Sequence, residues 1–279
     1  MIFVVLLFES MKDKEKGVYS LIYKFYRASS NHAIINFQKS VVCFSHASVF
    51  DDKNEADAVF STKISLMGTP LEANEKEILA SEIAAVRFRY RIFCACTNSD
   101  EEYLWKAYAE DEKGFCLEYD ENDFQSASNQ IIIRSVIYSE QIPELTGEQS
   151  PEEIVMNQLF YKRMDYMPEK EIRIIYPLPD RYIQVEKSNM QFEENMIENP
   201  DKGSNSVIYC SSIPIDHITR DNDKLPTFEK RTAPLNVEVP MQSKGIIIGR
   251  NCEKEIEERL REIAIKQGIR IRKRGKAEK

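Results

Sequence analysis

Two carboxylates and a guanidinium stand at alternating positions near the middle of the chain, at Glu169, Glu171 and Arg173. The β-branched Ile172 lies between Glu171 and Arg173, and Ile174 follows Arg173, a pattern that predicts a β-strand. Because successive side chains of a strand point to opposite faces, the three charged groups would share one face and the isoleucines the other. Such a face is either an ordinary solvated sheet surface or, in a sheltered cleft, a pair of acids that divide acid–base and electrostatic roles.

Periodicity and turn residues predict an α+β protein, with mixed sheets and flanking helices, that positions these groups. We expect strands at 18–26, 41–44, 92–96, 115–119, 131–138, 169–175, 182–185, 207–215, 245–248 and 269–272. We expect helices at 32–38, 71–90, 100–110, 152–164 and 252–266, and loops at 50–57 and 221–231. Ser99 and Glu102 have capping-box spacing, and Gly114 is expected to supply a left-handed helix end. The last strand, helix and strand should form a unit with parallel strands.

The composition fits one folded domain over residues 1–279, with a core from about 19 to 272 and a basic tail over 273–279. Hydrophobic residues make up 42% of the 279 residues, so the chain can bury a core. The net charge of −8 argues against a general affinity for nucleic acid. Arginine and lysine dominate residues 270–279, a stretch that could bind an acidic partner or be only a solvated end.

The remaining features narrow the classes of chemistry. Six cysteines without a secreted-scaffold spacing indicate a reduced, cytoplasmic protein. The apolar segment 1–8 lacks the basic region and length of a signal peptide, and no membrane association is expected. Phosphate-loop, dinucleotide-fingerprint and G-x-S-x-G motifs are absent. The three histidines are dispersed and the Cys94-x-Cys96 pair has no second pair, so no metal site is expected.

Four short segments in order resemble a large, mostly bacterial family known as domain-of-unknown-function family 2971. They are Tyr23–Arg27; Val41–Ser45 with Phe50–Asp52; Leu104–Ala109 leading into Lys113–Tyr119; and Lys162 with Glu169–Arg173. The resemblance extends from about residue 19 to 271. The chain departs from the family's pattern at 51–53, near Cys94 and Cys96, and at Tyr166, where the family often has tryptophan.

The order of motifs is also similar, more distantly, to ADP-ribosyltransferases of the Arg–Ser–Glu type. Those enzymes place an arginine on an early strand, a Ser/Thr-containing strand before a helix, and Glu-x-Glu on a later strand. Arg27, Cys96-Thr97 and Glu169-x-Glu171 follow that order. The resemblance implies an NAD-dependent transferase or NAD-cleaving enzyme, a toxin or phage-defence effector that modifies a macromolecule. It also implies NAD as the substrate, a nucleic-acid or protein acceptor, and a cognate antitoxin or partner protein.

The resemblance assigns roles to individual residues. Glu171 would stabilise the oxocarbenium-like ribose, and Glu169 would orient or deprotonate the acceptor. Arg27 would clamp the diphosphate, and Thr97 would hold Glu171 by a hydrogen bond. The expected cofactor-binding residues are Arg27, Tyr26, Thr97, Tyr108 and Arg173.

Structural roles remain open for most of these residues. Arg27 could simply cover the neighbouring aromatic surface, and Thr97 could be only a residue near a helix N-cap. Glu169 and Arg173 could form a cross-strand ion-pair ladder.

Two other functions fit the sequence. One is a non-catalytic module that binds a nucleotide or a protein. The other is a metal-dependent nuclease that uses acids of the loop at 50–57, namely Asp51, Asp52, Glu55 and Asp57.

Overall fold

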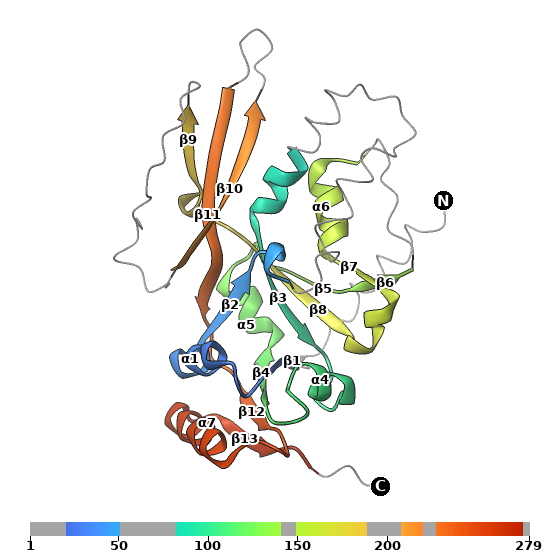
Figure 1. Ribbon diagram of the computed structural model, residues 1–279, viewed down its shortest axis with the longest axis vertical. Helices are drawn as coiled ribbons and strands as arrows, with labels where there is room; N and C mark the ends of the chain where they lie inside the picture. The colour runs from blue at the N-terminus through green and yellow to red at the C-terminus, as the bar shows by residue number, and fades with distance from the viewer. Residues whose placement is uncertain (1–20, 51–81, 141–148, 189–207, 220–226, 276–279) are drawn as a thin grey trace.

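The computed structural model describes residues 21–50, 82–140, 149–188, 208–219 and 227–275 (Figure 1). These residues form an α+β structure built on a mixed sheet, as predicted. The central path of the sheet runs in the order β10-β11-β2-β3-β1-β4-β12-β13, while β8 pairs with β3 and β5, and β9 pairs with β11. A small separate sheet joins β6 to β7.

The strands of the large sheet are β1 (Leu21–Tyr26), β2 (Val41–Ser45), β3 (Tyr90–Cys96), β4 (Phe115–Asp120), β5 (Ile132–Ser135), β8 (Glu171–Pro177), β9 (Gln184–Ser188), β10 (Ile208–Thr219), β11 (Thr227–Pro240), β12 (Gly245–Ile248) and β13 (Arg270–Lys273). The small sheet holds β6 (Ile137–Ser139) and β7 (Tyr161–Arg163). The helices are α1 (Asn31–Lys39), α4 (Glu102–Ala107), α5 (Glu121–Ala127), α6 (Pro151–Leu159) and α7 (Lys254–Gln267). Residues 82–88 are also helical, and short 3-10 turns occur at η3 (Ala47–Val49), η4 (Met164–Glu169) and η5 (Asp180–Tyr182).

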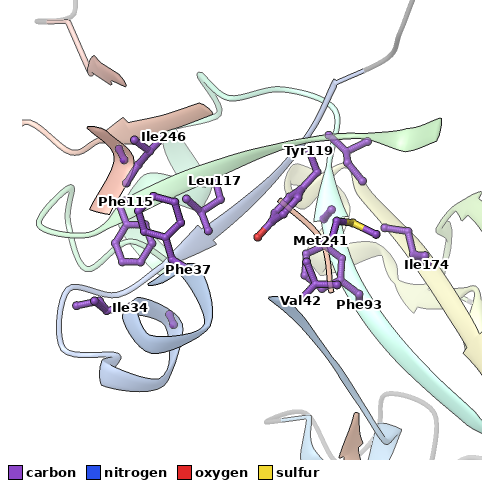
Figure 2. Close-up of a cluster of buried hydrophobic side chains, with 14 of the residues drawn as sticks. Ile34, Phe37, Val42, Phe93, Phe115, Leu117, Tyr119, Ile174, Met241 and Ile246 are labelled. Atoms are coloured by element: carbon purple, nitrogen blue, oxygen red, sulfur yellow. The ribbon is translucent and has the colours of Figure 1, made fainter. Parts of the chain in front are cut away.

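Helices cover both faces of the sheet. On one face α1, α5 and α7 pack over strand residues such as Phe93, Leu117 and Ile174, which form the largest buried cluster (Figure 2). On the other face α4 contributes Trp105 to a cluster around the middle of the sheet, and α6 packs over Ile175. This second face carries the side chains that line the site described below.

The pairing along β3 is uneven. Its edge toward β8 is paired over seven residues, from Tyr90 to Cys96. Its other edge meets β1 only at Tyr23 opposite Cys96, and β2 only at Ser45 opposite Ile92. β1 and β2 therefore diverge along β3, and the middle of β3 lies between them.

The C-terminal part follows the prediction. β12 and β13 are parallel, with α7 between them, and Gly268 ends α7 in a left-handed conformation at φ 68°. α7 and β13 lie at the end of the molecule opposite to the long β9–β10–β11 ribbon (Figure 1). No helix within the described ranges has the length and apolar character needed to cross a membrane.

Several local predictions were wrong. Ser99 does not cap α4; its carbonyl oxygen instead accepts a hydrogen bond from Trp105 Nε1 at 2.7 Å, and the helix begins at Glu102. Gly114 has no positive φ, because the left-handed residues after α4 lie at 110–112. A Cβ at Gly114 would lie 2.0 Å from the carbonyl oxygen of Tyr26, so close backbone approach explains the glycine.

Element boundaries account for the other differences. The strand expected at 131–138 breaks at Val136, whose N–H donates to the carbonyl of Glu171. The helix expected at 152–164 ends at Leu159, where the chain turns into β7 and η4. Residues 227–231, expected to be a loop, belong to β11, where they pair with β9 and β10.

The basic stretch at the C-terminus is largely neutralised where the structure describes it. Arg270 and Arg272 donate to the fully buried Glu118 of β4. Arg274 donates to Glu112 at 2.6 Å and to Glu102 at 2.8 Å. These cations fasten β13 to the body of the protein, which leaves less charge for an acidic partner.

Candidate functional site

The two glutamates reach one another through a turn rather than along one strand. Glu169 ends η4, Lys170 is left-handed at φ 45°, and Glu171 is the first residue of β8. The strand predicted to begin at Glu169 therefore begins two residues later. Glu171 and Arg173 do share one face of β8, and Ile174 faces the opposite core, as predicted.

Lys162 holds both carboxylates. Its Nζ lies 2.6 Å from Glu169 Oε2 and 2.7 Å from Glu171 Oε2, and about 5% of each of the three side chains is exposed. The ammonium also lies 4.8 Å from the centre of the Tyr166 ring. A single buried cation therefore bonds to both buried anions, which offsets part of the cost of burying them.

Arg173 forms a second ion pair with Glu171. It is fully buried; its Nε donates to Glu171 Oε1 at 2.8 Å and its Nη1 donates to the carbonyl oxygen of Leu159, also at 2.8 Å. Its guanidinium faces the ring of Phe50 at 5.7 Å. Both oxygens of Glu171 therefore accept hydrogen bonds from cations, which fixes the carboxylate plane.

This arrangement keeps Glu171 ionised. Burial alone would raise the pKa of the Glu171 carboxyl, but the charges of Arg173 and Lys162, with hydrogen bonds from Arg173 and the Cys94 thiol, hold that pKa well below its usual range. Glu171 is thus an anion at any physiological pH. Its chemistry is electrostatic stabilisation or acceptance of a hydrogen bond, and it cannot act as a general acid.

Two tyrosines complete the polar cluster. Tyr108, partly exposed at the end of α4, donates its hydroxyl to Glu169 Oε1 at 2.7 Å. Burial and this hydrogen bond raise the pKa of the Tyr108 hydroxyl well above its usual value. The Tyr138 hydroxyl accepts the backbone N–H of Glu171 at 2.8 Å, and burial raises the pKa of Tyr138 to about 12. Both phenols stay neutral and act through hydrogen bonds.

A cavity of about 280 Å³ opens above this cluster. Its polar wall holds Lys162, Glu169 and Glu171, and the rest of its lining is largely aromatic and apolar. The lining residues are Tyr23, Lys24, Phe25, Val49, Phe50, Cys94, Ala95, Cys96, Leu104, Tyr108, Lys162, Tyr166, Glu169 and Glu171. An apolar cavity with a few fixed polar groups is the usual form of a small-molecule site. We call it the first cavity.

The cysteines of this wall are not nucleophiles. Burial raises the pKa of Cys94 to about 12, helped by the charge of Glu171, and burial raises the pKa of Cys96 to about 11. Both thiols are protonated at neutral pH, and nucleophilic attack requires the thiolate. No cluster of three metal-ligating side chains occurs in the part of the chain that the structure describes.

The structure brings together only part of the predicted site. Glu169, Glu171 and Tyr108 line the first cavity, and Arg173 lies directly behind Glu171. Tyr26 lines a second cavity of about 480 Å³ and stacks on a ring of β4.

Arg27 and Thr97 do not join the cluster. Both side chains are exposed, and neither lines either cavity. Arg27 follows the last residue of β1 and Thr97 the last residue of β3, so each lies beyond the strand that lines the cavity. Thr97 does not hydrogen-bond to Glu171, whose carboxylate accepts instead from Lys162, Arg173 and Cys94.

No role was predicted for Lys162, although this residue belongs to one of the four family motifs. The sequence does contain one signal for Lys162. It follows an aromatic residue and precedes two acids by a few positions, and a lysine that is buried requires such anionic partners. Lys24 and Tyr138 were also missed. The acids proposed for a nuclease, Asp51, Asp52, Glu55 and Asp57, lie outside the described residues.

One comparison with known proteins bears on this region. Residues 104–174 match the family described as "Protein of unknown function (DUF2971)". That segment contains Tyr108, Lys162, Glu169, Glu171 and Arg173, the polar wall of the first cavity with its supports. No curated protein and no solved structure matches the chain. The expected resemblance to this family is therefore confirmed over residues 104–174, and the likeness to ADP-ribosyltransferases gains no support from the comparisons.

Proposed function

We propose that the first cavity binds the nicotinamide–ribose part of NAD and that the protein is an NAD-cleaving or ADP-ribosyltransferase-like enzyme. The observation that carries this proposal is the convergence of two buried carboxylates on Lys162 Nζ, at 2.6 and 2.7 Å, in the wall of a cavity with many aromatic rings. Aromatic rings such as Tyr23 and Phe25 suit a flat heterocycle. A carboxylate that neighbouring cations keep ionised suits a reaction that builds positive charge.

Cleavage of the nicotinamide–ribose bond builds such a charge. The bonding electrons leave with the nicotinamide nitrogen, which neutralises the ring, and the ribose carbon becomes an oxocarbenium-like cation. Glu171 supplies a preorganised negative charge for that state, which is typically the largest catalytic contribution. Its carboxylate accepts from Lys162, Arg173 and Cys94, and a carboxylate has about four acceptor positions. One ribose hydroxyl can therefore bind it as well.

We assign to Glu169 the role of orienting or deprotonating the acceptor. The carboxylate of Glu169 links the buried Lys162 to Tyr108, a residue that is 41% exposed at the end of α4. An acceptor hydroxyl or a water that reaches this rim would attack the ribose carbon, forming a new C–O bond while its proton passes to Glu169 or to solvent. Transfer to a macromolecule would make the protein a toxin or phage-defence effector, which stays a prediction.

The diphosphate must be bound by a cation other than Arg27, which the order of the motifs had suggested. Arg27 lies outside the cavity, whereas Lys24 lines it. We therefore assign the diphosphate contact to Lys24. Tyr108 and Arg173 keep supporting roles, Tyr108 on Glu169 and Arg173 on Glu171.

A non-catalytic binding module is the second candidate. The observation in its favour is that Lys162 binds both Glu169 and Glu171 and that Arg173 binds Glu171, so two cations already balance two anions without any ligand. Such a cluster could serve only to shape a nucleotide-binding cavity.

The experiment that separates the two candidates measures nicotinamide release from NAD, with NAD binding measured in parallel by calorimetry. Glu171→Gln keeps the shape of the side chain and removes its charge, and Glu258→Gln on the exposed face of α7 is the matched control. An enzyme requires release by wild type and by the control, with loss in Glu171→Gln. Binding without release in wild type supports the module, and no binding at all contradicts both candidates.

A further inference from the structure

A second cavity adjoins the first. It has a volume of about 480 Å³, and α1, β2 and β11 contribute to its walls. Four residues line both cavities: Lys24, Val49, Phe50 and Cys94. The junction lies where the middle of β3 has neither β1 nor β2 paired to its edge. A long ligand could therefore extend from one cavity into the other past Lys24.

A buried carboxylate faces the second cavity without a hydrogen bond. Glu238 of β11 is 2% exposed, and neither of its carboxylate oxygens has a hydrogen-bond partner among the described residues. Lys39 Nζ lies 3.9 Å from Glu238 Oε2, which gives a long ion pair and no hydrogen bond. A buried anion in this state is costly, and it gains strongly from any group that donates hydrogen bonds to it.

The rest of the cavity wall suits a nucleoside. Asn36 and Asn236 present amide groups that can both donate and accept, and Tyr26 supplies an aromatic side chain. Lys24 stands at the junction, and its charge acts on the thiols of Cys43, on the second-cavity side, and of Cys96, on the first-cavity side. Three charged side chains therefore follow one another along the two cavities: the anion Glu238, the cation Lys24 and the anion Glu171.

We propose that the second cavity holds the other nucleoside of the dinucleotide, with the vicinal hydroxyls of its ribose donating to Glu238 and the diphosphate passing Lys24. A carboxylate that accepts from a ribose diol is a common way to recognise a nucleoside. The proposal rests on the proposed function for the identity of the ligand, and it names the part of the ligand that the first cavity cannot hold.

This arrangement determines which dinucleotide binds. A phosphate on the 2′-oxygen of that ribose would bring a second negative charge to a buried carboxylate and remove one of the two donors. The site therefore selects NAD over NADP. Because ADP-ribose contains this nucleoside and the diphosphate but no nicotinamide, it tests the second cavity without requiring turnover.

The test is calorimetric titration of the full chain with ADP-ribose, NAD and NADP. Glu238→Gln, which keeps the size of the side chain, should weaken ADP-ribose and NAD by about tenfold to a hundredfold and narrow the preference for NAD over NADP. Glu258→Gln is the matched control. If thermal melting shows that Glu238→Gln does not fold, Lys24→Met serves as a second variant. It should weaken the binding of ADP-ribose and leave the binding of adenosine unchanged.

The two proposals fail separately. Equal affinity of wild type and Glu238→Gln for ADP-ribose, or equal binding of NAD and NADP by wild type, overturns the assignment of the second cavity, even where nicotinamide is released. Binding of ADP-ribose that depends on Glu238, without nicotinamide release, supports the second cavity and overturns the enzymatic function. With Lys24→Met alone, unchanged affinity for ADP-ribose overturns the placement of the diphosphate and with it the proposed path of the ligand.

Discussion

Replacing Lys162 by methionine removes the cation that Glu169 and Glu171 share while keeping a side chain of similar length. Since Lys162 Nζ lies 2.6 Å from one carboxylate and 2.7 Å from the other, the two oxygens are at most about 5 Å apart. At that separation, and at an effective dielectric constant of about 20, two unit charges repel by about 3 kcal/mol. Removing one partner of a buried pair typically costs about 3 to 5 kcal/mol. We expect the free energy of unfolding to fall by that amount at pH 8.

The loss should depend on pH in a defined direction. Without the cation, one carboxyl of the pair has its pKa raised above the unfolded value of about 4.3, so the folded variant binds a proton that the unfolded chain does not. That proton relieves the repulsion at low pH and is lost as the pH rises through the raised pKa. The difference between wild type and variant should therefore grow between pH 5 and pH 8, as measured by urea unfolding.

Two further variants make this test specific. Lys170→Met removes a cation that directly follows η4, pairs with Glu101 at 2.8 Å and is 58% exposed, and it should cost less than about 1 kcal/mol. The double variant Lys162→Met with Glu169→Gln should recover part of the loss, because one of the repelling charges is gone. A cost below about 1 kcal/mol for Lys162→Met, or a cost that does not change with pH, would show that Lys162 does not offset the repulsion between the two carboxylates.

The other predictions concern packing and titration elsewhere in the fold. Gly114→Ala should lower the free energy of unfolding by about 2 kcal/mol or more, because its Cβ would lie 2.0 Å from the carbonyl oxygen of Tyr26, whereas Gly275→Ala, with open space around it, should be neutral in the same thermal melts. Burial, with the charges of Arg91 and Arg87, lowers the pKa of His46 to about 3. The unfolded chain therefore binds a proton below about pH 6.5 that the folded chain does not, so stability should fall by up to about 1.4 kcal/mol per pH unit from pH 6.5 to 5. His46→Asn, which can still accept the N–H of Ser48, should flatten that slope in urea titrations, and an unchanged slope would rule out His46 as its source.

What could be predicted from the sequence was local. The alternation of Glu171 and Arg173 with isoleucines required only the two-residue period of a strand, and the final strand, helix and strand required only periodicity and the helix-ending Gly268. Glu169 was placed on the wrong element because the left-handed conformation of Lys170 is unusual for a lysine.

What could not be predicted depends on tertiary contacts. Lys162 comes next to the acids because α6 ends early and β7 turns the chain back, and no local pattern marks that turn. Arg27 was expected in the site because of the order of the motifs. That order does not show where β1 ends relative to the cavity, and Arg27 lies beyond the end of β1. The burial of the Glu238 carboxylate without a hydrogen bond depends on the pairing of β11 with β2, two strands that are far apart in the sequence.

The central claim is that the charge of Glu171 stabilises a positive charge that develops in the first cavity. The direct measurement is the rate of nicotinamide release from NAD at saturation, compared between wild type and Glu171→Gln, with the dissociation constant of NAD measured for both. We expect Glu171→Gln to reduce the rate by about a hundredfold or more and to change NAD binding far less. Equal rates in the two proteins would contradict it.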